Sequence, residues 1–269
     1  MDDEPSAPLL PGAVAFGELL GAEPLPPTER SGADEMFMYT GGTTGLPKGV
    51  VWRQRDLFDC QRFPTYGTIG RDYPTSVDEV VRIAVEVDAA GTAPRCLPLT
   101  PLMHATALFS VMDTLLLGGA AVFLPQRSFD AAATWRAVQH DRVQRLIIAG
   151  NAIGVPLADE LARAAAQGRP YDTSSLASVW SSGMAWSTDA KRMLLRQHPC
   201  HLLDILGSSE GGPYAYAQAH TVDDLPSPFR LAAGAVVLDE NLEPVPAGSG
   251  MAGVLAYAGG MPAGYYKDP

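Results

Sequence analysis

Short apolar runs alternate with longer segments of helical periodicity from about residue 36 to residue 206. Strands separated by helices of roughly 10–15 residues are typical of βαβ units, which place parallel strands in one sheet. The alternation predicts an α/β fold, with a largely parallel sheet and flanking helices. Expected strands cover residues 36–39, 50–52, 95–99, 120–124, 145–149, 176–180 and 202–206. Expected helices cover 14–20, 77–87, 105–117, 130–140 (with Ser128 as its N-cap), 155–166 and 187–197.

The pattern changes after about residue 228. Two apolar segments, 231–238 and 253–258, are separated by a turn signal, Asp-Glu-Asn. We therefore expect antiparallel strands in this region, which is typical of a small β-rich subdomain. The expected organisation is an extended lead-in rich in Pro and Gly over residues 1–34, an α/β core over 35–227 and the β-rich subdomain over 228–269.

Composition excludes several classes of function. Hydrophobic residues make up 46% of the 269 residues and charged residues 18%, which suits a chain with a sizeable buried core. Acidic residues outnumber basic ones by 30 to 19, and no basic patch is visible, so binding to nucleic acid or to an anionic membrane is not expected. The longest apolar stretch, residues 115–125, is interrupted by two glycines and is shorter than the ~20 residues of a membrane helix.

Cysteine usage favours a reduced compartment. Cys60, Cys96 and Cys200 lie far apart, and none belongs to a Cys-x-x-Cys pair, which argues against a disulfide scaffold or a cysteine zinc site. The acidic N-terminus, residues 1–5, has neither the basic nor the apolar region of a signal peptide. We therefore expect a cytoplasmic protein.

The segment over residues 39–50 reads Tyr-Thr-Gly-Gly-Thr-Thr-Gly-Leu-Pro-Lys-Gly-Val. Its four glycines let the backbone approach a ligand closely, its three threonines offer hydroxyl groups, and Lys48 adds a compact positive charge. Amides, hydroxyls and an ammonium group that converge in this way suit the phosphates of a nucleotide. The segment therefore predicts a loop that binds a polyphosphate.

Two other interpretations fit this segment less well. A P-loop requires Gly-Lys-Ser/Thr followed at once by a helix, whereas Lys48 precedes Gly49 and an expected strand. A hairpin turn without a ligand would explain the glycines, but such a turn rarely needs three threonines and a lysine in one run.

In order and spacing, residues 40–49 resemble the phosphate loop of the adenylate-forming superfamily, which includes acyl-CoA synthetases, luciferases and the adenylation domains of peptide synthetases. The resemblance extends from about Asp34 to the last residue. Four other segments in this range are similar to further motifs of that superfamily. They are 98–107 (the Pro-x-x-His segment by the acyl pocket), 181–185 (the strand end that contacts adenine), 207–210 (Tyr-Gly-x-Thr-Glu) and 264–269 (Gly-Tyr-x-x-x-Pro).

The resemblance implies an acid–thiol ligase that uses ATP and Mg²⁺ to activate a small-molecule carboxylic acid as its acyl-adenylate and then transfers the acyl group to coenzyme A. Gly41 and the Gly-Val-Val-Trp-Arg run after Lys48 look most like actinobacterial ligases for fatty acids and steroid side chains. We therefore expect an acid of one of these classes. Apolar surface and unpaired strands exposed at missing sheet edges would favour association, which leaves a homo-oligomer open.

The resemblance also implies roles for individual residues. Lys48, Thr44 and Glu210 would be catalytic, and Glu210 with Thr44 would hold Mg²⁺. Trp52, Trp180 and Trp186 are expected in the core rather than in contact with a ligand, although Trp186 adjoins the adenine segment. The implied pocket residues are His104, Ala105 and Trp186, and the implied ATP contacts are Thr40, Gly41, Gly42, Thr43, Thr44, Gly45, Lys48, Gly183, Met184, Ala185, Leu206, Gly207, Ser208 and Ser209.

Some features depart from the superfamily pattern. Leu206 stands where an aromatic residue usually stacks on adenine, a contact worth about 1 kcal/mol. Ala105 and Ala107 would narrow the acyl channel. The chain stops at Pro269, before the superfamily's ribose-binding aspartate and the small C-terminal domain with its lysine. We therefore expect the central part of a larger enzyme, with little activity alone. The alternative is a non-catalytic ATP- or acyl-binding module, or a subunit whose partner supplies that lysine.

Overall fold

The computed structural model describes residues 11–41, 46–126 and 128–267 of the chain. The chain divides into two compact units, residues 1–31 and 32–269. In the first unit, the short helix α1 (Phe16–Leu19) lies within the segment expected to be helical. All further elements belong to the second unit.

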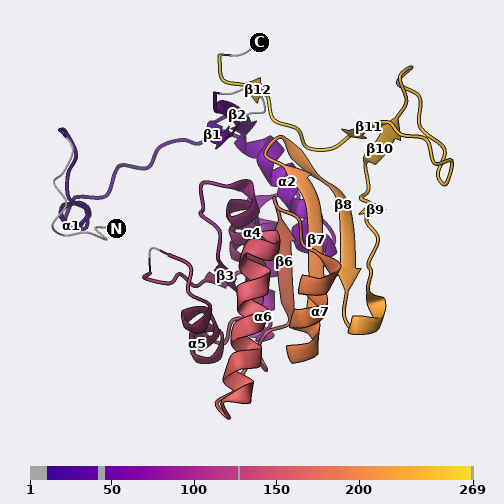
Figure 1. The fold of residues 1–269 in the computed structure, drawn as a ribbon. Coiled ribbons are helices and arrows are strands. Elements are labelled where there is room, and N and C mark those ends of the chain that lie inside the picture. The colour runs from indigo at the N-terminus through magenta and orange to yellow at the C-terminus, as the bar shows by residue number, and fades with distance from the viewer. Residues whose placement is uncertain (1–10, 42–45, 127, 268–269) are drawn as a thin grey trace. The chain divides into compact units, whose positions relative to one another are not determined.

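A seven-stranded sheet forms the centre of the second unit, in the order β4-β3-β5-β6-β7-β8-β9 (Figure 1). The pairings from β4 to β7 are parallel, whereas β8 and β9 join the sheet antiparallel. The expected, largely parallel sheet is therefore confirmed. The strands are β3 (Arg95–Pro98), β4 (Ala120–Ala121), β5 (Arg145–Ile148), β6 (Ser178–Ser182), β7 (His201–Ser208), β8 (Gly211–Ala219) and β9 (Arg230–Leu231).

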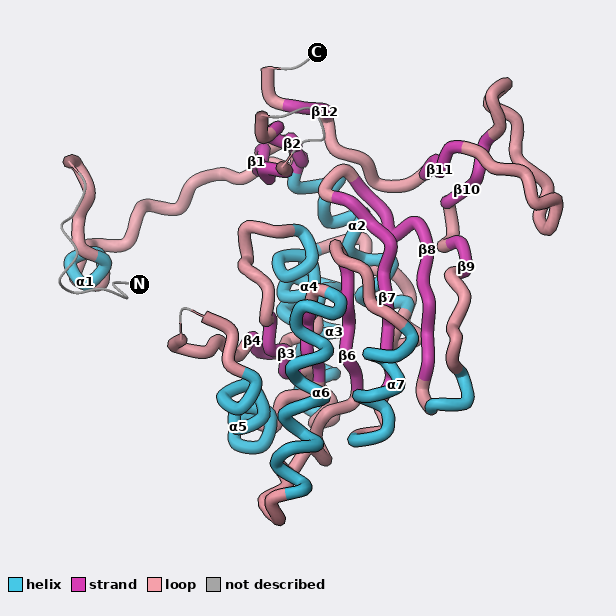
Figure 2. The backbone as a smooth tube through the Cα atoms, viewed as in Figure 1, coloured by secondary structure: helices cyan, strands magenta, loops and turns pink. Residues whose placement is uncertain are grey.

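Alternate residues of the strands face opposite sides of the sheet. Leu146 and Ile148 of β5 pack into the large core beneath helices α5, α6 and α7, which cover one face of the sheet (Figure 2). Ile147 lies on the other face, with Trp180 and Leu203 of the neighbouring strands. The helices are α2 (Gln54–Gly67), α3 (Val77–Ala89), α4 (Ala105–Leu116), α5 (Ala131–Asp141), α6 (Gly150–Ala166) and α7 (Thr188–Gln197).

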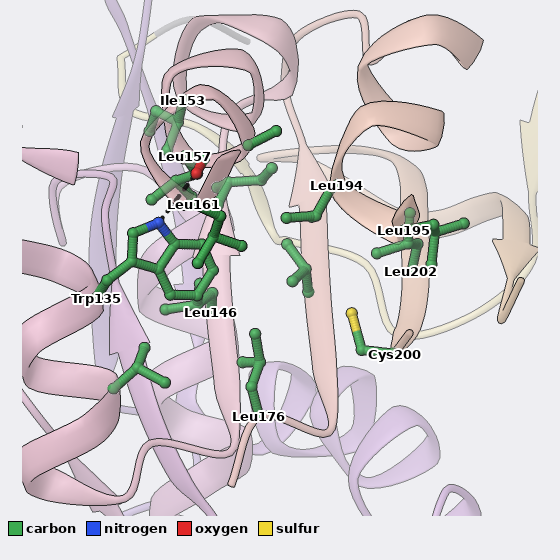
Figure 3. Packing of buried hydrophobic residues seen from close by; sticks show 14 of the residues in the cluster. Trp135, Leu146, Ile153, Leu157, Leu161, Leu176, Leu194, Leu195, Cys200 and Leu202 are labelled. Atoms are coloured by element: carbon green, nitrogen blue, oxygen red, sulfur yellow. Dashed lines mark hydrogen bonds between the residues drawn. The ribbon is translucent and has the colours of Figure 1, made fainter. Parts of the chain in front are cut away.

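Figure 3 shows the large core, in which Leu157 of α6 and Leu194 of α7 lie among the apolar residues of the sheet. Trp135 of α5 is fully buried there, and its indole Nε1 donates to the carbonyl of Leu157 at 3.0 Å. Because the tryptophan has a hydrogen-bond partner inside the core, its burial leaves no polar group unsatisfied.

Two smaller sheets complete the unit. The strands β1 (Glu35–Thr40), β2 (Lys48–Arg53) and β12 (Gly264–Tyr265) form an antiparallel sheet with β2 in the middle. The strands β10 (Ala235–Leu238) and β11 (Val254–Tyr257) form a separate antiparallel pair, which confirms the antiparallel strands expected after residue 228.

Several elements differ from the sequence prediction. Helix α2 and strand β8 were not expected, because α2 is polar with Pro64 inside it and β8 is rich in small residues. Helix α6 begins at Gly150 rather than at Val155. The N-cap of α5 is Asp130, not Ser128, since the Asp130 carboxylate accepts from the amide of Ala133 at 2.9 Å.

The three cysteines, Cys60, Cys96 and Cys200, are buried free thiols. In the described ranges, each helix is too short or too polar to span a bilayer.

Candidate active site

A cavity of about 1260 Å³ lies between the central sheet and the helices α2 and α4. Ile147, Trp180 and Leu203 form an apolar floor on the sheet. Pro64 of α2 and Phe109 of α4 line the opposite wall. Since the floor follows the direction of β5, β6 and β7, the cavity connects the carboxyl ends of these strands with their amino ends.

Many of the predicted site residues meet at the carboxyl ends of β6 and β7. In open α/β sheets, ligands bind at this edge of the sheet. Ser182 of β6 and Thr106 of α4 belong to the resembling segments 181–185 and 98–107 but were given no role of their own, and they line the cavity at the same place. The predicted residues that line it are Thr40, His104, Ala105, Gly183, Met184, Gly207, Ser208 and Ser209.

The predicted phosphate loop joins β1 to β2. These strands place Thr40 directly opposite Lys48 in the antiparallel register. Gly42, Thr43, Thr44 and Gly45, between them, lie outside the described residues. The roles expected for these four residues, including a Thr44 contact with Mg²⁺, therefore stay predictions.

Lys48 and Glu210, which are far apart in the sequence, are connected through Tyr265. The Lys48 ammonium lies 5.1 Å from the centroid of the Tyr265 ring, a cation–π contact. The Tyr265 hydroxyl donates to Glu210 Oε1 at 2.9 Å. Tyr265 reaches this position because β12 pairs with β2, with Tyr265 opposite Val50. The structure thus brings three of the resembling motifs to one place.

The turn between β7 and β8 is fastened to β2. The indole Nε1 of Trp52, which is fully buried, donates to the carbonyl of Ser209 at 2.9 Å. Within the turn, the Ser208 hydroxyl bonds with the hydroxyl of Tyr214 at 2.8 Å and accepts from the amide of Glu210 at 3.2 Å. Trp52 is therefore a core residue, as expected, and also positions the strand end that carries Glu210.

The loop after β6 is held by the start of α6. The amide of Gly150 donates to Ser181 Oγ at 2.9 Å, and the amide of Asn151 donates to the carbonyl of Ala185 at 3.0 Å. The Asn151 side chain accepts from the amide of Ser187 at 2.9 Å. This set of contacts orders the segment that contains Gly183, and sequence reasoning missed it because it predicted a later start of α6.

Some predicted residues lie away from the cavity lining. Leu206 is 46% exposed and points to the face of β7 opposite Ile205. Trp186 is buried in the large core, 5.3 Å from the Lys191 ammonium. Ala107 is fully buried within α4 and does not narrow the cavity. Trp180, expected in the core, is buried but lines the cavity as well.

Sequence reasoning also missed a polar group at the opposite end of the cavity. Asp113 of α4 is buried, and its Oδ1 accepts from the Thr65 hydroxyl at 2.6 Å. Gln61, in the orientation that satisfies its amide, donates to the same oxygen at 2.6 Å. Burial raises the pKa of Asp113 to about 7, against the lowering effect of the Thr65 hydrogen bond and of Arg145. A periodicity argument reads Asp113 only as one polar residue in an apolar helix.

Glu210 could hold a magnesium ion only with help from other ligands. The described parts of the chain contain no group of three or more His, Cys, Asp or Glu side chains that could hold a metal. Mg²⁺ is commonly bound by one or two carboxylates together with substrate phosphates and water, so a single carboxylate beside the predicted phosphate loop suits it. The donor set therefore fits Mg²⁺ that arrives with a nucleotide.

Comparison with known proteins agrees with the family resemblance of the sequence motifs. The family model described as "AMP-binding enzyme" matches residues 6–266. A medium/long-chain-fatty-acid–CoA/3-oxocholest-4-en-26-oate–CoA ligase of Mycolicibacterium smegmatis is 34% identical over 246 residues, which cover 89% of this chain and 43% of the relative. The medium-chain acyl-CoA ligase Mig of Mycobacterium avium is 32% identical and covers 99% of this chain and 48% of its own length. The chain thus spans less than half the length of these relatives.

Solved structures show the same fold. The luciferase-like enzyme of the mealworm Zophobas morio has a TM-score of 0.65 at 22% identity, over 91% of this chain and 52% of its own. A putative long-chain-fatty-acid CoA ligase of Rhodopseudomonas palustris has a TM-score of 0.64 at 22% identity, over 94% and 56%. The match of the family model across nearly the whole sequence, with relatives more than 30% identical, establishes that the chain belongs to the AMP-binding enzyme family.

Proposed function

We propose that this chain is the ATP- and acid-binding part of an acyl-CoA ligase, and that the acid is a fatty acid or a steroid side-chain acid. The observation that carries the proposal is the cavity itself. Its carboxyl-end rim holds residues from the predicted phosphate, adenine and Tyr-Gly-x-Thr-Glu motifs, and its apolar floor continues from that rim along the sheet. A nucleotide at the rim and an acyl chain on the floor would bring a carboxylate to a phosphate.

Positive charge at the rim is what the first half-reaction requires. A carboxylate that attacks the α-phosphate of ATP brings two anions together, so donors and cations must be in place beforehand. Lys48 provides the ammonium group, and its partner strand places Thr40 opposite it. We assign to both residues the binding of the phosphates that leave as pyrophosphate.

Glu210 is the residue that would hold Mg²⁺. When bound, this ion would neutralise charge on the phosphates and so favour departure of pyrophosphate. Tyr265 holds Glu210 Oε1 by its hydroxyl, which fixes the carboxylate before the nucleotide arrives. Trp52 does the same for the backbone at Ser209.

The class of acid is inferred from the cavity and from the relatives. The relatives are ligases that join coenzyme A to medium- and long-chain fatty acids or to 3-oxocholest-4-en-26-oate. A floor of Ile147, Trp180 and Leu203 suits a long apolar chain, because each side chain offers carbon surface to it. Coenzyme A is the acceptor that these activities share.

A substitution of Lys48 tests the proposal. Lys48→Ala should weaken ATP binding by about tenfold or more, since it removes a charge-assisted hydrogen bond to phosphate. The measurement is titration of the full chain with a fluorescent ATP analogue in the presence of Mg²⁺. Arg169→Ala, which removes an exposed cation in the loop after α6, is the matched control and should bind ATP as wild type does.

A second assay separates the ligase from a non-catalytic module. Exchange of labelled pyrophosphate into ATP, measured with mixed fatty acids, should depend on the acid and disappear in Lys48→Ala. ATP binding without any exchange by this chain would favour the non-catalytic module instead. Equal ATP affinity of wild type and Lys48→Ala would contradict the proposed phosphate site.

A further inference from the structure

The cavity contains buried polar atoms that the protein itself does not satisfy. Within the described residues, the buried side-chain atoms without a hydrogen-bond partner include Nε and Nη1 of Arg145, Oγ1 of Thr100 and Nε1 of Trp180. All three residues line the cavity. Because buried donors are nearly always paired, such a cluster indicates that something else supplies the acceptors.

Arg145 marks the end of the cavity that is remote from the nucleotide motifs. It is the first residue of β5 and lies on the same face as Ile147. Its register partner on β6 is Ser178, the first residue of that strand, whereas the predicted adenine segment, residues 181–185, includes the last residue of the strand, Ser182. Four residues at ~3.3 Å each place Arg145 roughly 13 Å along the strands from that rim.

The guanidinium group is held in a fixed orientation. Its central carbon lies 3.6 Å from the centroid of the Trp180 ring, which is close stacking. A stacked guanidinium keeps its hydrogen-bond donors at its edges, in the plane parallel to the ring. Arg145 therefore presents a preorganised set of donors rather than a mobile surface charge.

The charge of Arg145 is already balanced within the wall. Asp113 interacts electrostatically with Arg145, and each shifts the pKa of the other toward its charged form. The Asp113 Oδ1 atom accepts from Thr65 and Gln61, and Arg145 Nε and Nη1 have no hydrogen-bond partner in the described structure, Asp113 included. What these donors lack is an acceptor and not an additional negative charge.

We propose that Arg145, stacked on Trp180, binds an uncharged oxygen acceptor, a keto or hydroxyl group, at the end of the acyl group remote from the carboxylate. The proposal rests on the proposed function, because it places the carboxylate at the nucleotide rim. It deepens that function by naming the residue that would select, among the acids already proposed, those oxygenated near the distal end. A plain alkyl chain leaves the Arg145 donors unpaired, which a site built for hydrogen bonding penalises.

The test compares four acids of equal chain length in binding titrations with the full chain. One is a saturated long-chain acid, and the others carry a keto group, a hydroxyl group or a second carboxylate at the distal end. Wild type at pH 8, where Asp113 is ionised, should bind the keto or the hydroxy acid about tenfold or more tightly than the saturated acid. Tighter binding of the diacid than of both neutral oxygenated acids would overturn the assignment of an uncharged acceptor.

Substitution identifies the residue responsible. Arg145→Met should abolish the preference for oxygenated acids while leaving binding of the saturated acid within about threefold. The double variant D113N/R145M removes both opposite charges and so leaves the net charge of the cavity wall unchanged. It is used in place of Arg145→Met if the unpaired Asp113 carboxylate prevents folding. Arg95→Met, at the exposed first residue of the neighbouring strand β3, is the control and should keep the preference. A preference that survives loss of Arg145 would overturn the inference.

ATP titration separates this inference from the proposed function. If wild type binds ATP and acids but does not distinguish the oxygenated from the saturated acid, only the distal site is wrong. If wild type binds neither ATP nor any of the acids, the proposed function fails together with the inference.

Discussion

Glycine at position 150 is required by two separate conditions. Its φ of +49° lies in the left-handed region, and a Cβ placed there would lie 2.2 Å from the carbonyl oxygen of Ala185. The close approach is what allows the Gly150 amide to reach Ser181. At the scale of a single residue, this glycine therefore lets the start of α6 pack against the loop after β6, to which we assign contact with adenine.

Gly150→Ala should destabilise the protein more than strain in the backbone alone would. Gly168 is the matched control, because its φ is +69° but nothing lies within 4 Å of a Cβ placed there. We expect a loss of about 1 kcal/mol for Gly168→Ala and about 2–4 kcal/mol for Gly150→Ala, measured by chemical denaturation. Equal losses in the two variants would show that contact with Ala185 has no cost.

At the scale of elements, strand β2 connects Lys48 with the turn between β7 and β8. It carries Lys48 at one end, and Trp52 near its other end fixes the β7–β8 turn through Ser209. The link crosses between two sheets, so it sets the position of Glu210 relative to Lys48. A hydrogen bond to a backbone carbonyl is specific in distance and direction, unlike the apolar packing around it.

Trp52→Phe should keep most of the packing and lose only this hydrogen bond. We expect a stability loss of about 1 kcal/mol and an ATP affinity in Mg²⁺ lowered by ~3- to 10-fold, because the turn that carries Glu210 is less well held. Trp135→Phe is the comparison, since it loses a similar indole bond to Leu157 in the large core. That variant should lose similar stability but retain its ATP affinity, and an equal fall in affinity would argue against the role of Trp52.

Elements with strong periodicity were predictable, and those that depend on neighbours were not. The helix over 77–87 and the strand over 145–149 were found within a few residues of their observed bounds. Strand β8 was missed because its small residues give no clear alternation, and its pairing with β7 stabilises it instead. The subdomain boundary near residue 228 stays a prediction, since β9 belongs to the central sheet whereas β10 and β11 form their own.

For the molecule as a whole, the buried charge of Asp113 should make stability depend on pH. Its folded pKa of about 7 lies above the ordinary value of 3.8, so the folded state binds the proton more tightly than the unfolded state does. Stability from this group is therefore full below pH 4 and falls as the pH rises from about 4 to about 7. The pKa difference corresponds to a loss on the order of 4 kcal/mol at most.

Asp113→Asn removes this titration and can still accept from Thr65. Urea denaturation of both proteins at a series of pH values should show wild type losing stability relative to the variant between pH 4 and 7. The difference isolates Asp113, because the other titrating groups are common to both proteins. Parallel curves would mean that the carboxyl group titrates normally.

The candidate site as a whole was predictable at one end only. Residues 40–49, 181–185 and 207–210 resemble known motifs, so their meeting at one edge followed from the parallel sheet. Arg145 gave no such signal, since an arginine at the start of an apolar strand reads as an exposed end residue. Its place in the cavity depends on the stacking with Trp180, which only the three-dimensional arrangement reveals.

The pairing of β12 with β2 places Gly264 opposite Val51. During synthesis, the hairpin with Lys48 is thus made before the seven strands of the central sheet, and the strand that completes its sheet is made only after them. Contacts between such distant segments form late in folding, because the intervening chain must first be ordered. Tyr265, which connects Lys48 to Glu210, lies on this strand, so the proposed nucleotide site can be complete only after residue 265 has been synthesised and β12 has paired with β2.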